Sequence, residues 1–125
     1  MTTTLENTRK PDITFYRDGR IEITARVTKA LSLHPGDVID IAHDGSEYYL
    51  YVKHHNAIGR HEAQCHATYK GKTCNNLRAH SKRLCMAVLN VNGNGNEARL
   101  PVGEPTDHST LGTTIPIIIK RNIPR

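Results

Sequence analysis

The chain has 125 residues, of which 37% are hydrophobic and 23% charged, and its formal net charge is +5. This length fits one domain or two very small ones, and no run approaches the roughly 18 apolar residues that a membrane span needs. Three cysteines cannot form a complete disulfide framework, so we expect reduced thiols in a cytoplasmic protein. The polar N-terminus lacks the apolar segment of a secretory signal, and we expect residues 1–12 to form a disordered tail.

The positive charge is concentrated in the second half of the sequence. Residues 1–60 hold eight basic and eight acidic side chains, whereas residues 61–125 hold nine basic and four acidic ones. No acidic residue occurs between Glu62 and Glu97. A basic stretch of this kind favours a polyanionic partner, nucleic acid first and an acidic protein second, and it also fits a basic face that is simply solvated.

The first ordered segment is predicted to be a β-hairpin. Residues 13–16 and 21–24 each alternate apolar and polar side chains, which is typical of strands with one buried face. Asp18 and Gly19 between them favour a tight hairpin turn, because a type I′ turn needs positive φ at both central positions. Thr24 is then placed to cap a helix.

A short helix and a second hairpin follow. Apolar residues recur at helical spacing over residues 25–31, which predicts a helix of about two turns. The sequence His-Pro-Gly-Asp at 34–37 ends this helix in a turn. A second Asp-Gly turn joins strand candidates at 38–43 and 47–53, so this part of the chain is predicted to be β-β-α-β-β.

The remaining sequence predicts further strands and one helix. After a linker at 54–61, we expect a strand at 62–70, a helix at 74–90, and strands within 97–104 and 113–120. Each of the last two segments contains a proline, which favours an edge position or a bulge. The order strand, helix, strand, strand echoes the first part of the chain, although no repeat is visible residue by residue.

The order of parts in the first segment is that of a known family. A glycine and a basic residue, Gly19 and Arg20, precede a short strand and a small helix, and a Gly-Asp turn leads into an alternating strand. The apolar and turn positions of this pattern are Ile21, Ile23, Val27, Leu31, Leu33, Gly36, Asp37, Ile39 and Ile41. Over residues 13–53 the chain therefore resembles the AbrB-like, swapped-hairpin DNA-binding domains.

The patterns along the whole chain predict an α+β, mostly β fold, in which an α+β region at 54–125 packs with residues 13–53 or stands apart from them. For residues 13–53 alone, the resemblance implies a swapped-hairpin-like barrel. It also implies a homodimer that exchanges hairpins and regulates transcription by binding DNA. A segment of about forty residues with two one-sided hairpins cannot bury its apolar face alone. A second copy, or residues 54–125 of the same chain, must cover the apolar residues of both hairpins, which are Ile13, Phe15, Ile21, Ile23, Ile39, Ile41, Leu50 and Val52.

Duplex DNA is the partner we expect, contacted by basic side chains because these bind phosphate groups. The candidates come from the first turn, the short helix and the acid-free stretch: Arg17, Arg20, Arg26, Lys29, Lys70, Lys72, Arg78, Lys82 and Arg83. The alternative is a structural or protein-interaction module on the same scaffold without DNA binding. Asp18 and Glu22 favour that alternative, because a DNA-binding segment would carry positive charge there.

Two other kinds of site are considered. Cys65, Cys74 and His80 have the side chains that zinc prefers, and a zinc-stabilised fold is a variant of the second hypothesis, but no Cys-x₂-Cys pair supports a metal site. A Cys–His nucleophile pair would need an activating partner, and no such motif is present. We therefore expect no catalytic residues, no cofactor, no small-molecule substrate and no membrane partner.

Overall fold

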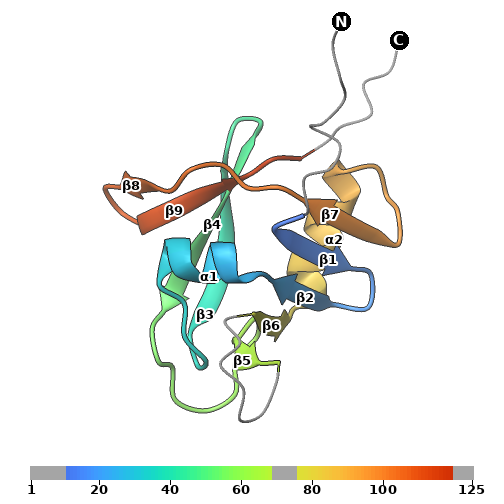
Figure 1. Ribbon diagram of the computed structural model, residues 1–125. Helices are drawn as coiled ribbons and strands as arrows, with labels where there is room; N and C mark the ends of the chain where they lie inside the picture. Colours follow the sequence, from blue (N-terminus) through green and yellow to red (C-terminus); the bar gives the residue numbers. More distant parts are fainter. Residues whose placement is uncertain (1–10, 69–75, 120–125) are drawn as a thin grey trace, which may run out of the picture.

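A computed structural model describes residues 11–68 and 76–119 of the chain (Figure 1). Lys70, Lys72 and Cys74 lie outside these residues, as do residues 1–10 of the expected tail. The elements in chain order are β1 (Ile13–Tyr16), β2 (Arg20–Ile23), α1 (Ala25–Leu31), β3 (Val38–Asp44), β4 (Glu47–His54), β5 (His66–Ala67), β6 (Leu77–His80), α2 (Lys82–Val91), β7 (Glu97–Leu100), β8 (Thr106–His108) and β9 (Gly112–Ile117). The predicted α+β, mostly β class is confirmed, and so is the β-β-α-β-β order of the first part.

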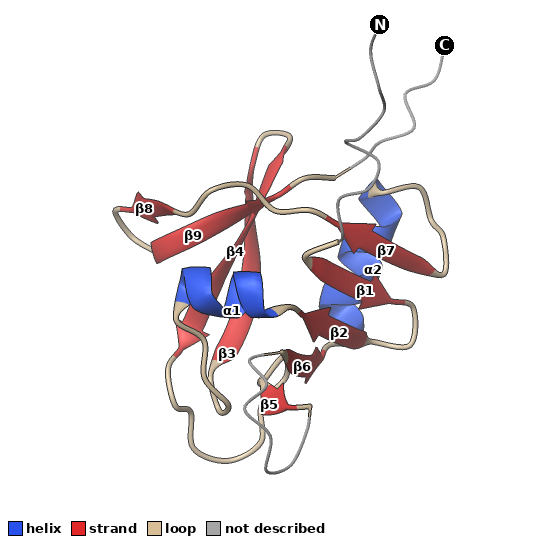
Figure 2. Cartoon of the chain, in the orientation of Figure 1, coloured by secondary structure: helices blue, strands red, loops and turns tan. Residues whose placement is uncertain are grey.

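The described strands form two antiparallel sheets (Figure 2). The five-stranded sheet has the order β5-β6-β2-β1-β7, and the four-stranded sheet has the order β3-β4-β9-β8. Helix α2 contacts β1, β2 and β7 and so covers one face of the five-stranded sheet, whereas α1 contacts β9. Within residues 11–68 and 76–119, neither helix is long and apolar enough to cross a membrane.

The predicted barrel does not close. Outside the two sheets, residues 11–68 and 76–119 form only isolated bridges, between Val38 and Gln64 and between Val102 and Ile117. The described strands β5 and β7 are the two edges of the five-stranded sheet, and neither pairs through a continuous ladder with a strand of the four-stranded sheet. The two sheets are therefore separate layers around one core.

The first hairpin forms over the predicted residues, but its turn is not the expected type I′, because, of Asp18 and Gly19, only Gly19 has a positive φ. Ile13 pairs with Ile23 and Phe15 with Ile21, so the apolar side chains of β1 and β2 share one face. Gly19 in the turn has a φ of 104°. This conformation favours glycine, and a Cβ atom there would lie 2.7 Å from the ring of His80, which would have to move.

The predicted helix at 74–90 is wrong in its first part. Residues 77–80 form β6, in which Leu77 and Ala79 are buried and Arg78 and His80 are exposed. Strand β6 pairs with β2, and this long-range pairing outweighs the helical spacing of the apolar residues. Ser81 then begins α2, because its side chain accepts a hydrogen bond from the Leu84 amide at 3.1 Å.

Helix α1 begins differently. Thr24 occupies the N-cap position, but its hydroxyl makes no capping bond and donates instead to the carbonyl of Asp12 at 2.8 Å. The Asp12 side chain accepts from the Val102 amide at 2.9 Å. Asp12 was expected to belong to the disordered tail, but it is buried. Its bonds join the start of the fold to the segment after β7.

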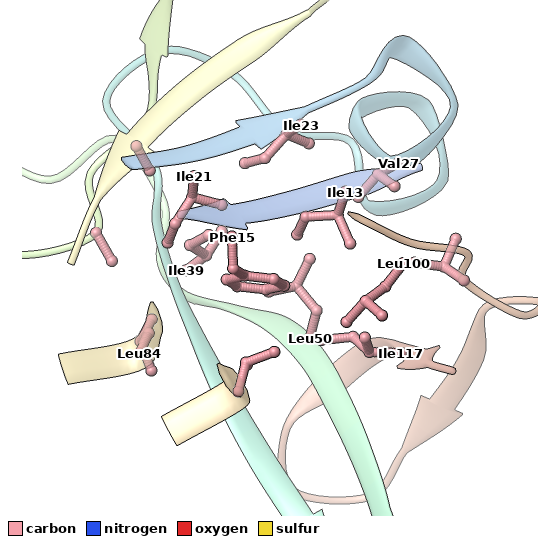
Figure 3. Close-up of a cluster of buried hydrophobic side chains, with 14 of the residues drawn as sticks. Ile13, Phe15, Ile21, Ile23, Val27, Ile39, Leu50, Leu84, Leu100 and Ile117 are labelled. Carbon is pink, nitrogen blue, oxygen red and sulfur yellow. The ribbon is translucent and has the colours of Figure 1, made fainter. Parts of the chain in front are cut away.

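One hydrophobic core is shared by both parts of the chain (Figure 3). Six of the eight apolar residues that were expected to need a partner are buried, and Ile41 and Val52 are partly buried against the same cluster. The second part contributes the residues that cover them, Leu77, Ala79, Leu84, Cys85, Val88, Leu89, Ala98, Leu100, Val102, Ile115 and Ile117. The reason for expecting a homodimer is thereby removed, since residues 54–125 cover the apolar face within one chain.

Candidate nucleic-acid interface

The face of the five-stranded sheet opposite α2 carries a polar surface, which we call the outer face. Alternation along the strands places its side chains on one side: Thr14, Tyr16, Arg20, Glu22, Arg78, His80, Glu97 and Arg99. Their neighbours in the sequence, such as Phe15, Ile21 and Ala79, are buried in the core. The outer face thus exists because each strand has one apolar and one polar side.

One cross-strand row on this face joins both parts of the chain. Thr14 lies opposite Arg99 on one side and Glu22 on the other, and Glu22 lies opposite Arg78. Directly opposed residues in a sheet are close enough for their side chains to interact. The row across four strands is therefore Arg99, Thr14, Glu22 and Arg78, with a cationic side chain at each end and one anionic side chain beside Arg78.

Glu22 is the centre of this row. Its carboxylate accepts hydrogen bonds from the Tyr16 hydroxyl at 3.2 Å and from Arg78 at 3.0 Å. Arg20 lies 3.9 Å from the same carboxylate, and its guanidinium carbon is 4.0 Å from the centroid of the Tyr16 ring. Burial, followed by the charge of Glu22, raises the pKa of Tyr16, which keeps this hydroxyl a hydrogen-bond donor.

The outer face is hollowed beside Glu22. A cavity of about 580 Å³ is lined by Thr14, Tyr16, Glu22, Arg78 and Arg99, together with residues that precede β6. Arg78 and Arg99 are half exposed or more, at 50% and 62% of their side-chain surface. Two guanidinium groups are thus accessible on either side of the Glu22 carboxylate.

Arg17 lies beside this face, in the turn between β1 and β2. Its guanidinium donates to the carbonyls of Asn94 and Gly95 at 3.3 and 3.0 Å, and no described carboxylate is paired with it. It holds the loop after α2 against the turn. Arg20 and Arg78, which share Glu22, are therefore the predicted DNA contacts that the structure brings together, and Arg17 lies at the adjacent turn.

Other predicted contacts lie elsewhere. Arg26 is 3.6 Å from Glu104, and it lines a separate hollow with Lys29 on the side of α1. Lys82 is exposed at the start of α2. These three residues do not belong to the outer face.

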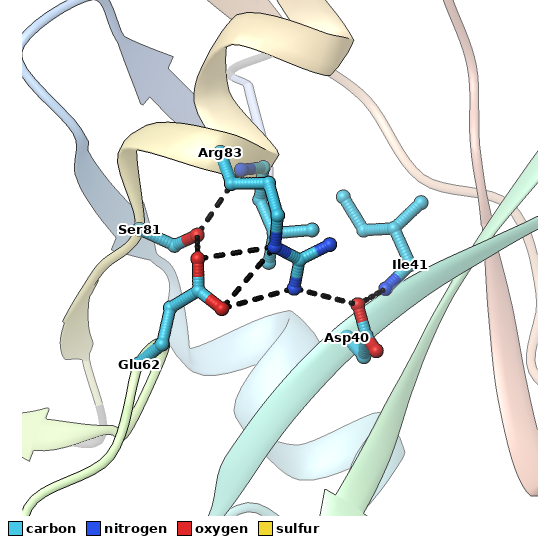
Figure 4. Close-up of polar contacts among 6 residues, drawn as sticks. Asp40, Ile41, Glu62, Ser81 and Arg83 are labelled. Carbon is cyan, nitrogen blue, oxygen red and sulfur yellow. Dashed lines mark hydrogen bonds and ion pairs between the residues drawn. The ribbon is translucent and has the colours of Figure 1, made fainter.

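Arg83 takes part in a clamp between the two parts of the chain (Figure 4). Its guanidinium donates to Glu62 at 3.0 Å and lies 3.7 Å from Asp40 of β3. The Ser81 hydroxyl also donates to Glu62, at 2.8 Å. The hydrogen bonds from Arg83, and then that from Ser81, lower the pKa of Glu62, so this carboxylate is ionised and Arg83 is occupied.

The described thiols are buried. Burial, followed by the charge of Asp37, raises the pKa of Cys65 to about 12, and burial raises the pKa of Cys85 to about 11. Such thiols are protonated at neutral pH, which disfavours nucleophilic attack. His80 is within 3.0 Å of the Asp18 carbonyl, and within residues 11–68 and 76–119 no group of three His, Cys, Asp or Glu side chains could hold a metal ion.

Sequence reasoning missed two residues of the outer face. Arg99 lies between the buried Ala98 and Leu100, an alternation that indicates an exposed side chain but not that β7 pairs with β1. Tyr16 carries no charge and was not among the predicted contacts, and its ring is covered by Arg20. Comparisons of the chain with protein-family models, with curated proteins and with solved structures found no match.

Proposed function

We propose that the protein binds duplex DNA across the outer face of its five-stranded sheet. The observation that carries this proposal is the presence of three arginines on one face of the sheet: Arg20 on β2, Arg78 on the neighbouring β6, and Arg99 on β7, which β1 separates from β2. Arg17 lies at the neighbouring turn and is not counted with these three, because its guanidinium donates to backbone carbonyls. Arginine binds phosphate oxygens through a planar set of donors, which a single lysine cannot offer.

Carboxylates on the same face do not prevent this function. Arg20 and Arg78 share Glu22, and Arg99 pairs with Glu97, so three guanidinium groups face two carboxylates. Ion pairs between solvent-exposed side chains typically contribute only about 0–1 kcal/mol. A DNA phosphate can therefore replace a carboxylate as the partner of an arginine, and counterion release then favours the complex.

We further propose that residues 13–53 are an AbrB-like unit whose second set of hairpins is supplied by the same chain. The β-β-α-β-β order supports this, and so does the pairing of β2 with β6 and β4 with β9. A DNA-binding protein of this kind fits a role in transcription regulation. Catalysis by a cysteine nucleophile is disfavoured at Cys65 and Cys85 by their raised pKa values.

Fluorescence anisotropy of a labelled duplex tests the proposal. If three arginines contact phosphates, raising the salt from about 50 to about 200 mM should weaken binding roughly 40-fold. Arg78→Gln should weaken binding and reduce the salt slope by about one. The matched control is Arg26→Gln, which removes the same charge from an ion pair beside α1 and should leave both quantities unchanged.

Two results would refute DNA binding by the outer face. One is the absence of duplex binding at the lower salt concentration, and the other is an equal loss of affinity in both variants. The first result would favour a protein-interaction module on the same scaffold, which the carboxylate partners of Arg20, Arg26, Arg78 and Arg83 support.

A further inference from the structure

The loop between β4 and β5 presents an apolar side chain to solvent. Ile58 is 93% exposed, and the next most exposed large hydrophobic side chain of the described residues, Ile118, is 46% exposed. We refer to residues 55–61 as the Ile58 loop. An isoleucine that is almost fully solvated gains from burial when a partner covers it.

Buried polar groups fix the Ile58 loop. The backbone amide of Asn56 donates to the Asp37 carboxylate at 2.7 Å, and Asp37 is only 2% exposed. The side chain of Gln64, 7% exposed, donates to the Ala57 carbonyl at 3.2 Å. A ring nitrogen of His61 is 2.7 Å from the Ile58 carbonyl itself. The loop is thus held in one conformation, so little conformational entropy is lost when it binds.

The chain segment around Ile58 is basic. Lys53, His54, His55 and Arg60 are exposed, and no acidic residue occurs from Lys53 to His61. The Asp37 carboxylate that holds the loop is buried, and Glu62, which follows the loop, is occupied by Arg83. The loop leads towards β5, the edge strand of the five-stranded sheet (Figure 1).

We propose that Ile58 is a wedge that inserts between base pairs of the bound duplex from the minor groove, with Arg60 contacting the groove. This inference rests on the proposed DNA binding and adds a second contact to it. Proteins that bind the minor groove commonly insert an apolar side chain between base steps and place arginine beside it. An exposed isoleucine on a fixed loop, within a basic segment, meets both requirements.

A duplex with a central mismatch provides the test, because its base step is already partly unstacked. We expect the wild-type protein to bind the mismatched duplex roughly tenfold more tightly than the matched duplex, since part of the unstacking cost is removed. Ile58→Ala should abolish this preference, because it weakens binding of the mismatched duplex more than binding of the matched duplex. Ile118→Ala removes the other exposed isoleucine and should keep the preference.

The outcomes separate the two proposals. Salt-dependent binding of the matched duplex without any mismatch preference, or a preference that survives Ile58→Ala, would overturn the wedge and leave DNA binding by the outer face in place. If the wild-type protein binds neither duplex at low salt, both proposals fail. Loss of the preference in Ile58→Ala together with unchanged thermal stability is the result that supports the wedge.

Discussion

The two parts of the chain have a similar order of elements and different roles. In residues 13–54, two hairpins flank α1, and each hairpin is closed by a local turn. In residues 55–119, the strands pair mainly with the first part: β6 with β2, β7 with β1, and β9 with β4. The second part therefore occupies the place in which a second copy of the first would otherwise be needed. A half-buried unit can be completed by its own chain, and a dimer is then unnecessary.

The largest expected effect concerns the shared core. Phe15→Ala in the first part should lower the free energy of unfolding by about 3–5 kcal/mol, and Leu100→Ala in the second part by about 2–5 kcal/mol, because both side chains are fully buried. Chemical denaturation followed by circular dichroism measures both values. We expect a single transition in each variant. If Leu100→Ala unfolded residues 76–119 in a separate step, the two parts would not share one core.

Substitutions at the N-terminus of each helix should cause smaller losses in the free energy of unfolding. Ser81→Ala removes a capping bond to Leu84 and a bond to Glu62, and it should cost about 1–2 kcal/mol. Thr24→Ala removes one bond to the Asp12 carbonyl and no capping bond, so we expect about 1 kcal/mol or less. Thermal unfolding of both variants ranks them. Equal losses, or a larger loss for Thr24→Ala, would show that the capping bond of α2 adds nothing to its stability.

The sequence predicted the first part better than the second for a physical reason. The hairpin of β1 and β2 is determined by residues close together in the chain, namely the alternation of Ile13, Phe15, Ile21 and Ile23 around one Asp-Gly turn. Strand β6 depends on β2, a partner more than fifty residues away, and its apolar residues are spaced in a way that also suits a helix. Pairing of this kind is not visible in local patterns.

The residues of the candidate site were predictable from the sequence, but their arrangement was not. Arg20 and Arg78 were identified by their charge, but their proximity follows from the β2–β6 register. Arg83 was identified by the same criterion and is occupied by Glu62 and Asp40. Charge alone does not distinguish an arginine on an open face from one in a structural clamp, because the difference lies in which carboxylate the fold places beside it.

The most direct test of the outer face uses two variants that should act in opposite directions. Glu22→Gln removes the carboxylate that holds Arg78, and we expect it to strengthen duplex binding about threefold to tenfold at low salt. Arg78→Gln should weaken binding by a similar factor. Anisotropy titrations of the wild type and both variants, with thermal unfolding as the control for folding, give the order of affinities. The predicted order is Glu22→Gln, wild type, Arg78→Gln, and weaker or unchanged binding by Glu22→Gln would contradict the account.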